Sequence, residues 1–497
     1  MNHTKLPLKI LLLLLSLLLL VSCTNVVMPT PEVSLPGEES KSESQIMEEF
    51  LSQLPVVESS EIEEIVGQPF TVLTADETLF FGEETAAGSI RNALQSRNKL
   101  FLSAYEMELT VVTVPEDEIA EVLTAAMESG VAAGDLLCYS AETTAALFAA
   151  GLLQDMNRLP YFDPNSACLD AVSATELAYR GQVYAMPDPS AQSRDEMFVM
   201  FYDRDLVEKA GLERPENLVL RGEWTYEAFQ TYSETIAEAV MNSTSHDLAK
   251  DVFGYAAPEH DTLLPYLLWS CGRESLLVYD EEGNLSFPYE KATLLEAITT
   301  QRGIYDSASR HPLEGEEAQN AFMAGRVGFL IEQLEFIKAL YTKSSRSYGI
   351  LPMPKKEGAT RYSCPVSARG KLLSVPKLMN NPAKTGLGLT ALCTAGGFLV
   401  RRAEKETYIS LYSTDNDQSC MLEILLDSQY FDFATVFGGI DPSISGLTTD
   451  LLSYVMVDDS SRLSSLIRHG KEDLAAYLPK LEAILHPAVD VPEEEVS

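Results

Sequence analysis

The sequence predicts an α/β protein built from two doubly wound lobes. Strand, helix, strand, helix and strand patterns follow one another between residues 69 and 138, which indicates parallel strands joined by right-handed crossovers. Residues 197–202 are apolar without interruption, as is typical of a strand buried on both faces. The chain has 497 residues, which is enough for two lobes with a core each.

The first lobe is expected to contain five elements before residue 140. They are strands at 69–73, 107–114 and 134–138 and helices at 89–105 and 116–128. In a parallel sheet of this kind, ligands bind beyond the carboxyl ends of the strands. We therefore expect ligand contacts from Asp76 and Glu77 after the first strand, and from Tyr139 and Ser140 after the third.

The buried strand at 197–202 leads into two predicted helices. The first is short and amphipathic and ends at Gly211, a residue type that often caps a helix C-terminus. The second follows Trp224, has Thr225 as its N-cap and carries an apolar stripe as far as Val240. We expect Trp224 to anchor this helix in a core.

The N-terminus has the pattern of a secretory signal. Two lysines precede an apolar core at 10–21, which is shorter than the roughly 20 residues of a membrane span. The segment ends in Leu-Val-Ser-Cys, which resembles a bacterial lipobox. Residues 1–23 are therefore predicted to be a signal peptide, with Cys23 as the lipidated residue; an ordinary signal peptide or an uncleaved anchor is the alternative.

Both ends of the remaining chain are predicted to lie outside the lobes. Residues 24–66 are rich in Ser, Pro and Glu, so we expect a flexible acidic tether with one short amphipathic patch at 46–54. Residues 488–497 are predicted to be an acidic tail.

Composition and motifs disfavour several classes of function. The formal net charge of -38 would repel nucleic acid. The sequence has no CxxC pair and no Cys or His at metal-ligand spacing, so neither a metal nor another cofactor is expected. It also lacks a G-x-S-x-G elbow, an H-E-x-x-H helix and a P-loop, so catalysis has no positive support.

Several motifs occur in an order that characterises one protein family. Besides the segment at 197–232, they are Gly-Gln-Val-Tyr-Ala-Met-Pro at 181–187, Asn-Ala-Phe-Met-Ala-Gly-Arg-Val-Gly-Phe-Leu at 320–330 and Tyr-Gly-Ile-Leu-Pro-Met-Pro at 348–354. The chain therefore resembles the extracellular solute-binding proteins of bacterial ABC importers, family 1. The resemblance extends from about residue 67 to about residue 485.

This resemblance implies a periplasmic-binding-protein-like fold, in which two doubly wound α/β lobes are joined by a hinge of several crossings. The strand at 197–202 would be the first crossing. Lobe 1 would comprise residues 67–200 and 330–367, and lobe 2 residues 201–329 and 368–487.

The resemblance also implies a function. Such a protein captures a small solute, expected here to be a carbohydrate, by closing its lobes, and delivers it to the permease subunits of an ABC importer. It would act as a monomer held by the lipid on Cys23 at the extracellular face of the cell membrane. Further ligand contacts are expected from Tyr184, Trp269, Glu332 and Gln333, since sugar rings stack on aromatic side chains and their hydroxyls bind polar ones. For Trp269, a buried structural role is the alternative.

Other functions and ligands stay open. A secreted surface lipoprotein could be an enzyme acting on glycans, and a protein of the same fold could sense its ligand without a role in transport. At residues 332–335, Glu-Gln-Leu-Glu replaces the Gly and Trp that many family members have there. This difference leaves a smaller sugar or a cationic solute open as the ligand.

Overall fold

The computed structural model describes most of the chain between residues 63 and 437 and parts of the two terminal regions. The described residues are 48, 50, 52–57, 63–82, 88–164, 175–188, 192–240, 250–257, 277–279, 285–286, 299–300, 302–304, 307–312, 314–437 and 460–485. The predicted signal peptide at 1–23, the acidic tail at 488–497 and Trp269 lie outside them.

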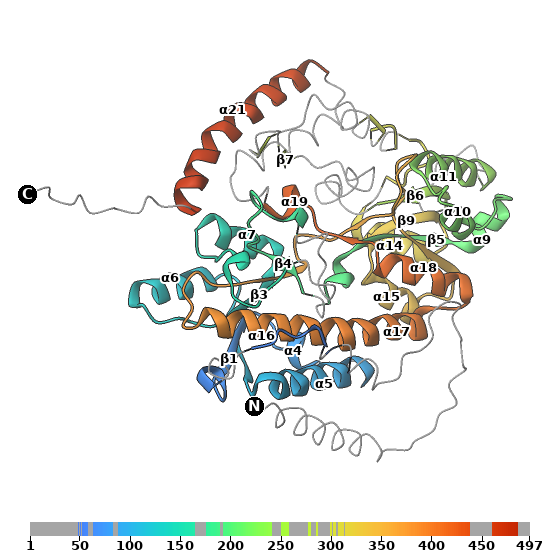
Figure 1. Ribbon diagram of the computed structural model, residues 1–497. Helices are drawn as coiled ribbons and strands as arrows, with labels where there is room; N and C mark the ends of the chain where they lie inside the picture. The colour runs from blue at the N-terminus through green and yellow to red at the C-terminus, as the bar shows by residue number, and fades with distance from the viewer. Residues whose placement is uncertain are drawn as a thin grey trace, which may run out of the picture.

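A five-stranded sheet with the order β2-β1-β3-β12-β4 forms the first lobe (Figure 1). Its strands are β1 (Pro69–Thr74), β2 (Glu108–Thr113), β3 (Leu136–Ser140), β4 (Met186–Pro187) and β12 (Lys371–Ser374). β1 pairs in parallel with β2 and β3, as the sequence predicts, whereas β12 lies antiparallel to β3 and β4. The carboxyl ends of β1 to β3 therefore share one edge with the start of β12, where Lys371 lies opposite Ser140.

Helices connect the strands of this sheet in the predicted order. They are α4 (Thr78–Phe81) and α5 (Gly88–Tyr105) before β2, α6 (Ile119–Ser129) before β3, and α7 (Ala141–Ala149) and the 3-10 turn η1 (Met156–Arg158) after it. The Ser140 hydroxyl caps α7 by accepting a hydrogen bond from the Thr143 N–H at 3.1 Å. α6 ends at Gly130, whose φ of 71° is the left-handed conformation that favours glycine.

A four-stranded sheet with the order β10-β5-β9-β6 forms the second lobe. Its strands are β5 (Phe198–Asp203), β6 (Phe253–Ala256), β9 (Val327–Gln333) and β10 (Tyr348–Leu351). β5 lies between β10 and β9, antiparallel to both, and all six of its residues are buried. Burial on both faces explains the uninterrupted apolar run of this strand.

The second lobe contains the two predicted helices, α9 (Arg204–Lys209) and α11 (Tyr226–Val240), and an unpredicted helix, α10 (Pro215–Arg221), in the Pro-containing stretch between them. Its further helices include α14 (Gly315–Met323) and α15 (Phe336–Lys343). Thr225 is the N-cap of α11, because its hydroxyl accepts a hydrogen bond from the Ala228 N–H at 3.3 Å. Gly325 follows α14 with a φ of 70°, the left-handed conformation that favours glycine after a helix.

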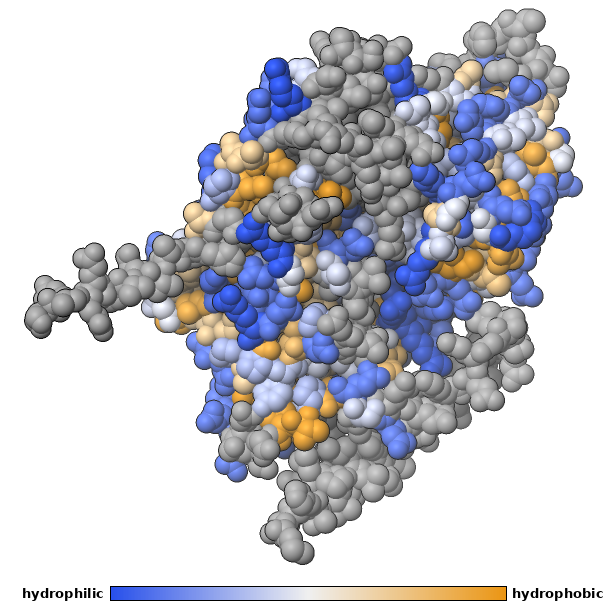
Figure 2. Space-filling model, turned by 45° about the horizontal axis from the view of Figure 1, so that its top comes forward, coloured by the Kyte–Doolittle hydropathy of each residue, from blue (hydrophilic) through white to orange (hydrophobic). Residues whose placement is uncertain are grey.

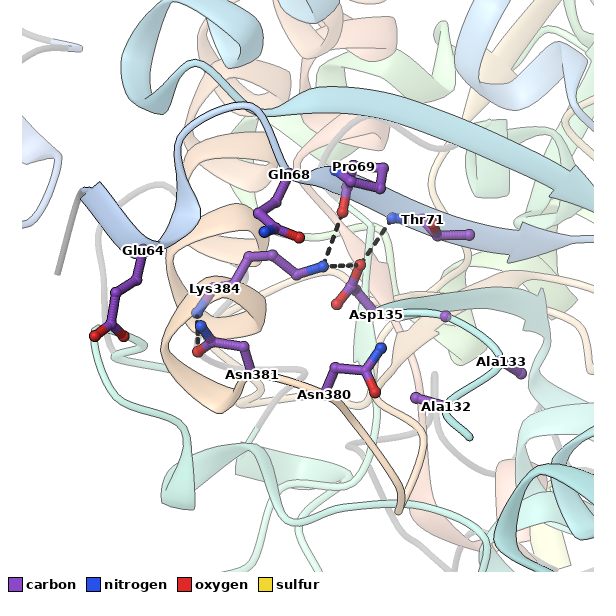
Figure 3. A pocket seen from close by; sticks show the side chains of 11 residues that line it. Glu64, Gln68, Pro69, Thr71, Ala132, Ala133, Asp135, Asn380, Asn381 and Lys384 are labelled. Atoms are coloured by element: carbon purple, nitrogen blue, oxygen red, sulfur yellow. Dashed lines mark hydrogen bonds and ion pairs between the residues drawn. The ribbon is translucent and has the colours of Figure 1, made fainter. Parts of the chain in front are cut away.

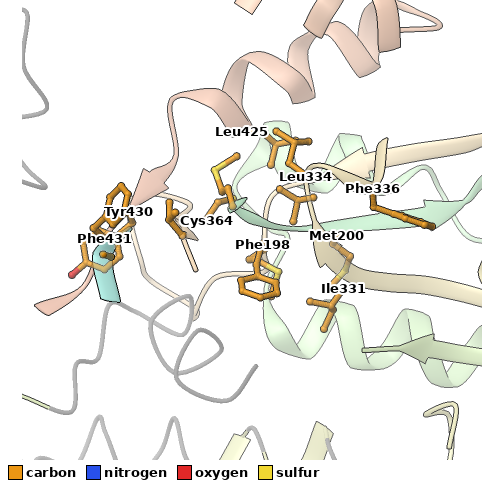
Figure 4. Packing of buried hydrophobic residues seen from close by; sticks show 14 of the residues in the cluster. Phe198, Met200, Ile331, Leu334, Phe336, Cys364, Leu425, Tyr430 and Phe431 are labelled. Carbon is orange, nitrogen blue, oxygen red and sulfur yellow. The ribbon is translucent and has the colours of Figure 1, made fainter. Parts of the chain in front are cut away.

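Trp224 lies in the core, as predicted. Its side chain is fully buried, and its indole N–H donates to the carbonyl of Pro352 at 3.1 Å. The ring of Phe329 lies 5.7 Å away and that of Tyr232 5.9 Å away, both measured between ring centroids. Phe198, at the start of β5, packs in the same hydrophobic core as Leu334 and Phe336 (Figure 4).

One long helix runs beside both sheets (Figure 1). It consists of α16 (Pro382–Ala395), the π-helical turn η3 (Gly396–Val400) and α17 (Arg401–Tyr412), and α18 (Asn416–Leu426) follows it. Within the described residues, this is the one helix long and apolar enough to cross a membrane, but 78% of its most apolar 18-residue stretch is buried inside the protein. We therefore interpret it as a helix of the protein core.

Smaller elements complete the described structure. They are the paired strands β7 (Val278–Tyr279) and β8 (Leu285–Ser286), the paired strands β11 (Cys364–Pro365) and β13 (Gln429–Tyr430), and the helices α19 (Phe433–Phe437) and α21 (Ser460–Leu485). The β7–β8 pair confirms the hairpin that the turn residues between them predict. On the face shown in Figure 2, apolar side chains form separate small groups among hydrophilic ones.

The two sheets divide the chain differently from the predicted lobe boundaries. β9 and β10 both pair with β5, so residues 330–367, expected in lobe 1, contribute the strand β10 and the helix α15 to the second lobe. Conversely, residues 368–487 were expected in lobe 2, but their strand β12 belongs to the first sheet and their helix α16 is bound to β1 of that sheet. An apolar strand can enter either sheet, and its pairing partner is decided by tertiary contacts that the pattern does not contain.

Trp224 gives a test of this core. We expect Trp224→Ala to lower the free energy of unfolding by about 3 to 5 kcal/mol, because it leaves a large cavity and removes the hydrogen bond to Pro352. Urea unfolding followed by circular dichroism measures the change. The exposed Leu220 is the control, since Leu220→Ala should stay within about 0.5 kcal/mol of the parent protein. Equal stabilities for the two variants would contradict the packing described.

Candidate ligand-binding site

Three consecutive charged residues lie where the chain passes from the first sheet to the second. They belong to the 3-10 turn η2 (Gln192–Glu196), which follows β4 and precedes β5. Together their side chains bind both sheet edges and the helices α15 and α17. We use the name hinge cluster for Arg194, Asp195, Glu196, Gln333, Ser367 and Arg369.

Glu196 joins the edges of both sheets. Its Oε2 accepts hydrogen bonds from Gln333 Nε2 at 2.9 Å, Ser367 Oγ at 2.6 Å and Arg369 Nε at 3.1 Å. Gln333 ends β9 in the second sheet, whereas Arg369 lies in the loop before β12 in the first. Arg369 Nη2 also donates to Gln333 Oε1 at 2.6 Å, so the two edges are linked directly.

Arg194 and Asp195 bind side chains of the helices α15 and α17. Arg194 forms an ion pair with Glu404 of α17, and both side chains are more than nine-tenths buried. Asp195 accepts a hydrogen bond from the Tyr408 hydroxyl of α17 and one from Lys338 Nζ of α15 at 2.5 Å. Burial and the Asp195 carboxylate raise the pKa of Tyr408 well above its usual range, so this phenol remains a neutral donor.

A second polar group lies at the same edge of the first sheet. Glu116, which follows β2, accepts hydrogen bonds from the Ser140 and Thr143 hydroxyls and from Lys371 Nζ at 2.8 Å. Burial alone raises the pKa of Glu116, but the hydrogen bonds from Lys371 and the two hydroxyls outweigh it, so the pKa lies below its usual range. The Lys371 backbone N–H donates to Ser193 Oγ at 2.8 Å, which connects this group to the η2 turn.

This arrangement can bind a polar solute between the two sheet edges. Arg369 is 65% exposed, although its Nε and Nη2 atoms are fixed by Glu196 and Gln333. Its guanidinium is therefore held in one orientation while its outer edge faces solvent. Carboxylate, amide, hydroxyl and guanidinium groups on both edges can donate to and accept from hydroxyls of a ligand.

Comparison with protein families identifies the class of this chain. A family profile described as bacterial extracellular solute-binding protein matches residues 99–394. The chain belongs to this family. A sequence comparison with curated proteins found no match.

Solved structures of similar fold include three whose TM-scores exceed 0.5. A cyclic alpha-maltosyl-1,6-maltose binding protein from Arthrobacter globiformis has a TM-score of 0.54 and 14% identity, with 82% of this chain and 98% of that chain covered. UspC from M. tuberculosis has a TM-score of 0.55 and 14% identity, with 82% and 99% covered. A cyclo/maltodextrin-binding protein complexed with maltotetraose has a TM-score of 0.53 and 13% identity, with 82% and 97% covered. At these identities the likeness shows a shared fold.

Family membership decides between two of the functions left open by the sequence. Extracellular solute-binding proteins bind their ligands and do not transform them, so this chain is a binding protein rather than a glycan-processing enzyme. It also places the protein in an extracellular or periplasmic compartment. The periplasmic-binding-protein-like fold predicted from the motifs is likewise confirmed.

Two of the predicted ligand residues lie exposed at the expected edge. Asp76 and Glu77 directly follow β1, and both are solvent-exposed. Asp76 Oδ1 accepts a hydrogen bond from the Thr78 N–H at 2.9 Å, which orients the carboxylate at the start of α4. Ser140 lies at the end of β3 on this same edge, but it is only 6% exposed. Its hydroxyl donates to Glu116 and accepts from the Thr143 N–H in the first turn of α7.

The two predicted tyrosines lie below the surface, so the structure corrects their expected role. Tyr139 is fully buried, and its hydroxyl donates to the Val114 carbonyl at 3.0 Å. Tyr184 is 3% exposed and packs its ring 5.0 Å from that of Phe148. All of β3 is buried, so a side chain on it can point only into a packed layer. In this structure neither tyrosine can contact a ligand directly.

The predicted pair on β9 has divided roles. Gln333 belongs to the hinge cluster. Glu332 is 8% exposed, and its carboxylate accepts hydrogen bonds from Gln319 Nε2 and from the Gln333 N–H, each at 2.9 Å. Desolvation by burial raises the pKa of Glu332. Adjacent strand residues point to opposite faces, which explains why one side chain reaches the edge and the other the interior.

Sequence reasoning missed most of the residues that the edge brings together. They are Glu116, Glu196, Ser367, Arg369 and Lys371. A usable signal exists for some of them, because Glu196 directly precedes the apolar run at 197–202, and Ser367 and Arg369 lie shortly before the strand β12. Polar residues next to an apolar crossing strand mark the junction between lobes.

A polar cavity of about 320 Å³ lies at the opposite edge of the first sheet, near the start of β1 (Figure 3). The ion pair between Asp135 and Lys384, with an N–O distance of 2.9 Å, forms part of its wall. Asp135 also accepts a hydrogen bond from the Thr71 N–H at 2.9 Å, and Lys384 donates to the Pro69 carbonyl at 2.8 Å. These contacts tie α16 to β1 and β3, so we interpret the pair as structural.

No cluster suited to a metal ion occurs among the residues that the structure describes. Asp415 and Asp417, which resemble the start of a calcium loop, are bound by cations of the protein instead. Arg204 Nη1 lies 2.7 Å from Asp415, and Arg214 Nη1 lies 2.9 Å from Asp417. The described cysteines, Cys138, Cys364, Cys393 and Cys420, are free thiols.

The raised pKa of Glu332 predicts a pH-dependent stability. A raised folded-state pKa contributes stability at low pH, and this contribution is lost as pH rises through the folded-state pKa. We therefore expect Glu332→Gln, which keeps the shape of the side chain, to gain stability relative to the parent protein as pH rises from 4 to 7. Urea unfolding at several pH values measures the difference. The exposed Glu357→Gln variant controls for removal of one negative charge away from Glu332, and a parallel response of both variants would contradict the assignment.

Proposed function

We propose that this solute-binding protein captures a carbohydrate between the facing edges of its two sheets and delivers it to an ABC permease. The observation that carries this proposal is the hinge cluster, in which Arg369 of one lobe and Gln333 of the other share Glu196 at the junction. The solute would bind as the edges approach, because contacts from both lobes then act together.

The chemistry of the two edges suits hydroxyl groups. The outer side of Arg369 supplies fixed donors, and the exposed Asp76 and Glu77 supply acceptors. Two of the structural neighbours are described as binding glucose-based ligands, a cyclic maltosyl-maltose and maltotetraose, which supports a carbohydrate. Trp269 remains a predicted stacking residue outside the described part of the chain.

The acidic side chains at the edge favour a second ligand class. Asp76 and Glu77 are exposed carboxylates, and the whole chain carries a formal net charge of -38, so a cationic solute would be attracted.

The partner protein distinguishes transport from sensing, since a permease would receive the solute whereas a sensor protein would respond to the closed form of the binding protein. We propose a monomer that delivers its ligand.

A thermal-shift screen tests the proposed ligand class. Maltotetraose, a cyclic glucan, monosaccharides, amino acids and spermidine are each added in large excess. A ligand at a hundredfold excess over its Kd stabilises the folded state by about 2.7 kcal/mol, so a carbohydrate should raise the melting temperature measurably. If spermidine alone shifts the transition, the carbohydrate proposal fails and the binding role stands.

The same screen on two arginine variants tests the proposed site. Arg369→Ala should weaken binding by about 1 to 3 kcal/mol, since it removes a charged hydrogen-bond donor. Arg402 of α17 pairs with Glu406 on the protein surface, so Arg402→Ala should bind as the parent does. Unchanged affinity in Arg369→Ala would place the ligand elsewhere.

We also propose that the lipid on Cys23 holds the protein at the extracellular face of the cell membrane. The Leu-Val-Ser-Cys sequence supports this attachment, because the cysteine follows a short apolar segment at the position where lipidation occurs. Cys23→Ser should move the protein from the membrane fraction to the soluble fraction, as an immunoblot of fractionated cells would record. Thr24→Ser, at the neighbouring position, is the matched control. Retention of Cys23→Ser in the membrane fraction would contradict lipid attachment at this residue.

A further inference from the structure

A segment before the first strand packs on the outside of the long helix. Phe50, within the predicted tether, is only 1% exposed. It forms a small hydrophobic cluster with Leu100 of α5 and Ala395 of α16. Its ring meets that of Phe398, in the π-helical turn η3, edge to face with 6.4 Å between centroids. The tether is therefore not solvated along its whole predicted length.

Further contacts extend from Phe50 along α5. Leu54 packs against this cluster and against the core of the first lobe, and Val57 packs against that core alone. The Tyr105 hydroxyl, at the end of α5, donates to the Pro55 carbonyl at 3.4 Å. Val56, between them, is 97% exposed, so the segment covers the helix with one face only. Phe50, Leu54 and Val57 thus contact the protein, whereas Val56 faces solvent.

Phe50 covers the turn that joins the two segments of the long helix. The turn η3 joins α16, which is tied to β1 by the bond from Lys384 to Pro69, to α17. α17 in turn reaches the second lobe, where Lys405 lies 3.6 Å from Glu423 of α18 and Tyr412 packs 5.6 Å from Tyr341 of α15. π-helical turns are places where helices kink. The geometry of η3 therefore contributes to the angle between the lobes.

We propose that Phe50 and residues 52–57 form a strap that packs on η3 and thereby couples this N-terminal segment to the hinge. The docking surface consists of α5 and η3, and its occupant is this segment. When the strap is docked, the ring of Phe50 covers Phe398 and limits bending between α16 and α17. The inference does not depend on which solute binds.

Hydrogen exchange tests the clamp. In the purified full chain, Phe50→Ala should raise amide exchange in Gly396–Val400 by about tenfold, because local opening becomes easier when its cover is removed. Val56→Ala, in the same segment but exposed, should leave this exchange unchanged. Exchange in β1 reports whether the lobe itself stays folded, and Phe50→Leu should restore most of the protection. Equal exchange at η3 in Phe50→Ala and the parent would overturn the clamp.

Single-molecule fluorescence tests the coupling to the hinge. Fluorophores introduced as unnatural amino acids at the exposed positions of Val131 and Leu220 report the distance between the two lobes. We expect Phe50→Ala to broaden the distance distribution and Val56→Ala to leave it as in the parent. A distribution that stays unchanged while exchange at η3 rises would show that the strap clamps the turn without acting on the hinge, and would refute the coupling.

Discussion

The arrangement of the two lobes depends on the η2 turn, where three adjacent charged side chains contact both sheet edges and two helices. Glu196 binds the sheet edges, Asp195 binds α15 and α17, and Arg194 pairs with Glu404 of α17. Because all three side chains are fixed by partners, a rotation of the turn would disturb these contacts together. Within the described residues, β5, β9, β12 and α17 are all positioned by partners of this turn.

Charges at such a junction have an energetic cost that apolar residues would not have. Removing an ion pair such as Arg194–Glu404 from water costs several kcal/mol per ion, and the attraction between the partners offsets this only with good geometry. Loss of one partner from a buried pair costs about 3 to 5 kcal/mol, which is large against a typical folding free energy of about 5 to 15 kcal/mol. The pair is thus better explained by the single orientation that it imposes on η2 than by net stability.

Much of the fold could be predicted from local pattern, and the site could be predicted only in part. The parallel β1–β3 unit, the buried strand β5 and the core position of Trp224 follow from periodicity and residue type. The sheet that β9 joins and the different sheet that β12 joins could not be predicted, because the pattern of an apolar strand does not specify its pairing partner. Tyr139 was misassigned since proximity to a strand end does not reveal which way a side chain points. Phe50 lies in the short amphipathic patch predicted within the tether, but the apolar residues of such a patch do not reveal the surface on which they dock.

The dual role of Arg369 gives a physical reason why ligand binding and lobe arrangement should be linked. A ligand can shift a conformational equilibrium only by the difference in its affinity for the two states. Arg369 of the first lobe is fixed by Gln333 of the second only when the two edges meet, so its guanidinium is oriented for a ligand only in that arrangement. In a separated arrangement the same side chain would recover its rotamer freedom, and holding it for the ligand would cost on the order of 1 kcal/mol. On the proposed function, a solute that contacts Arg369 therefore favours the arrangement in which the hinge cluster is complete.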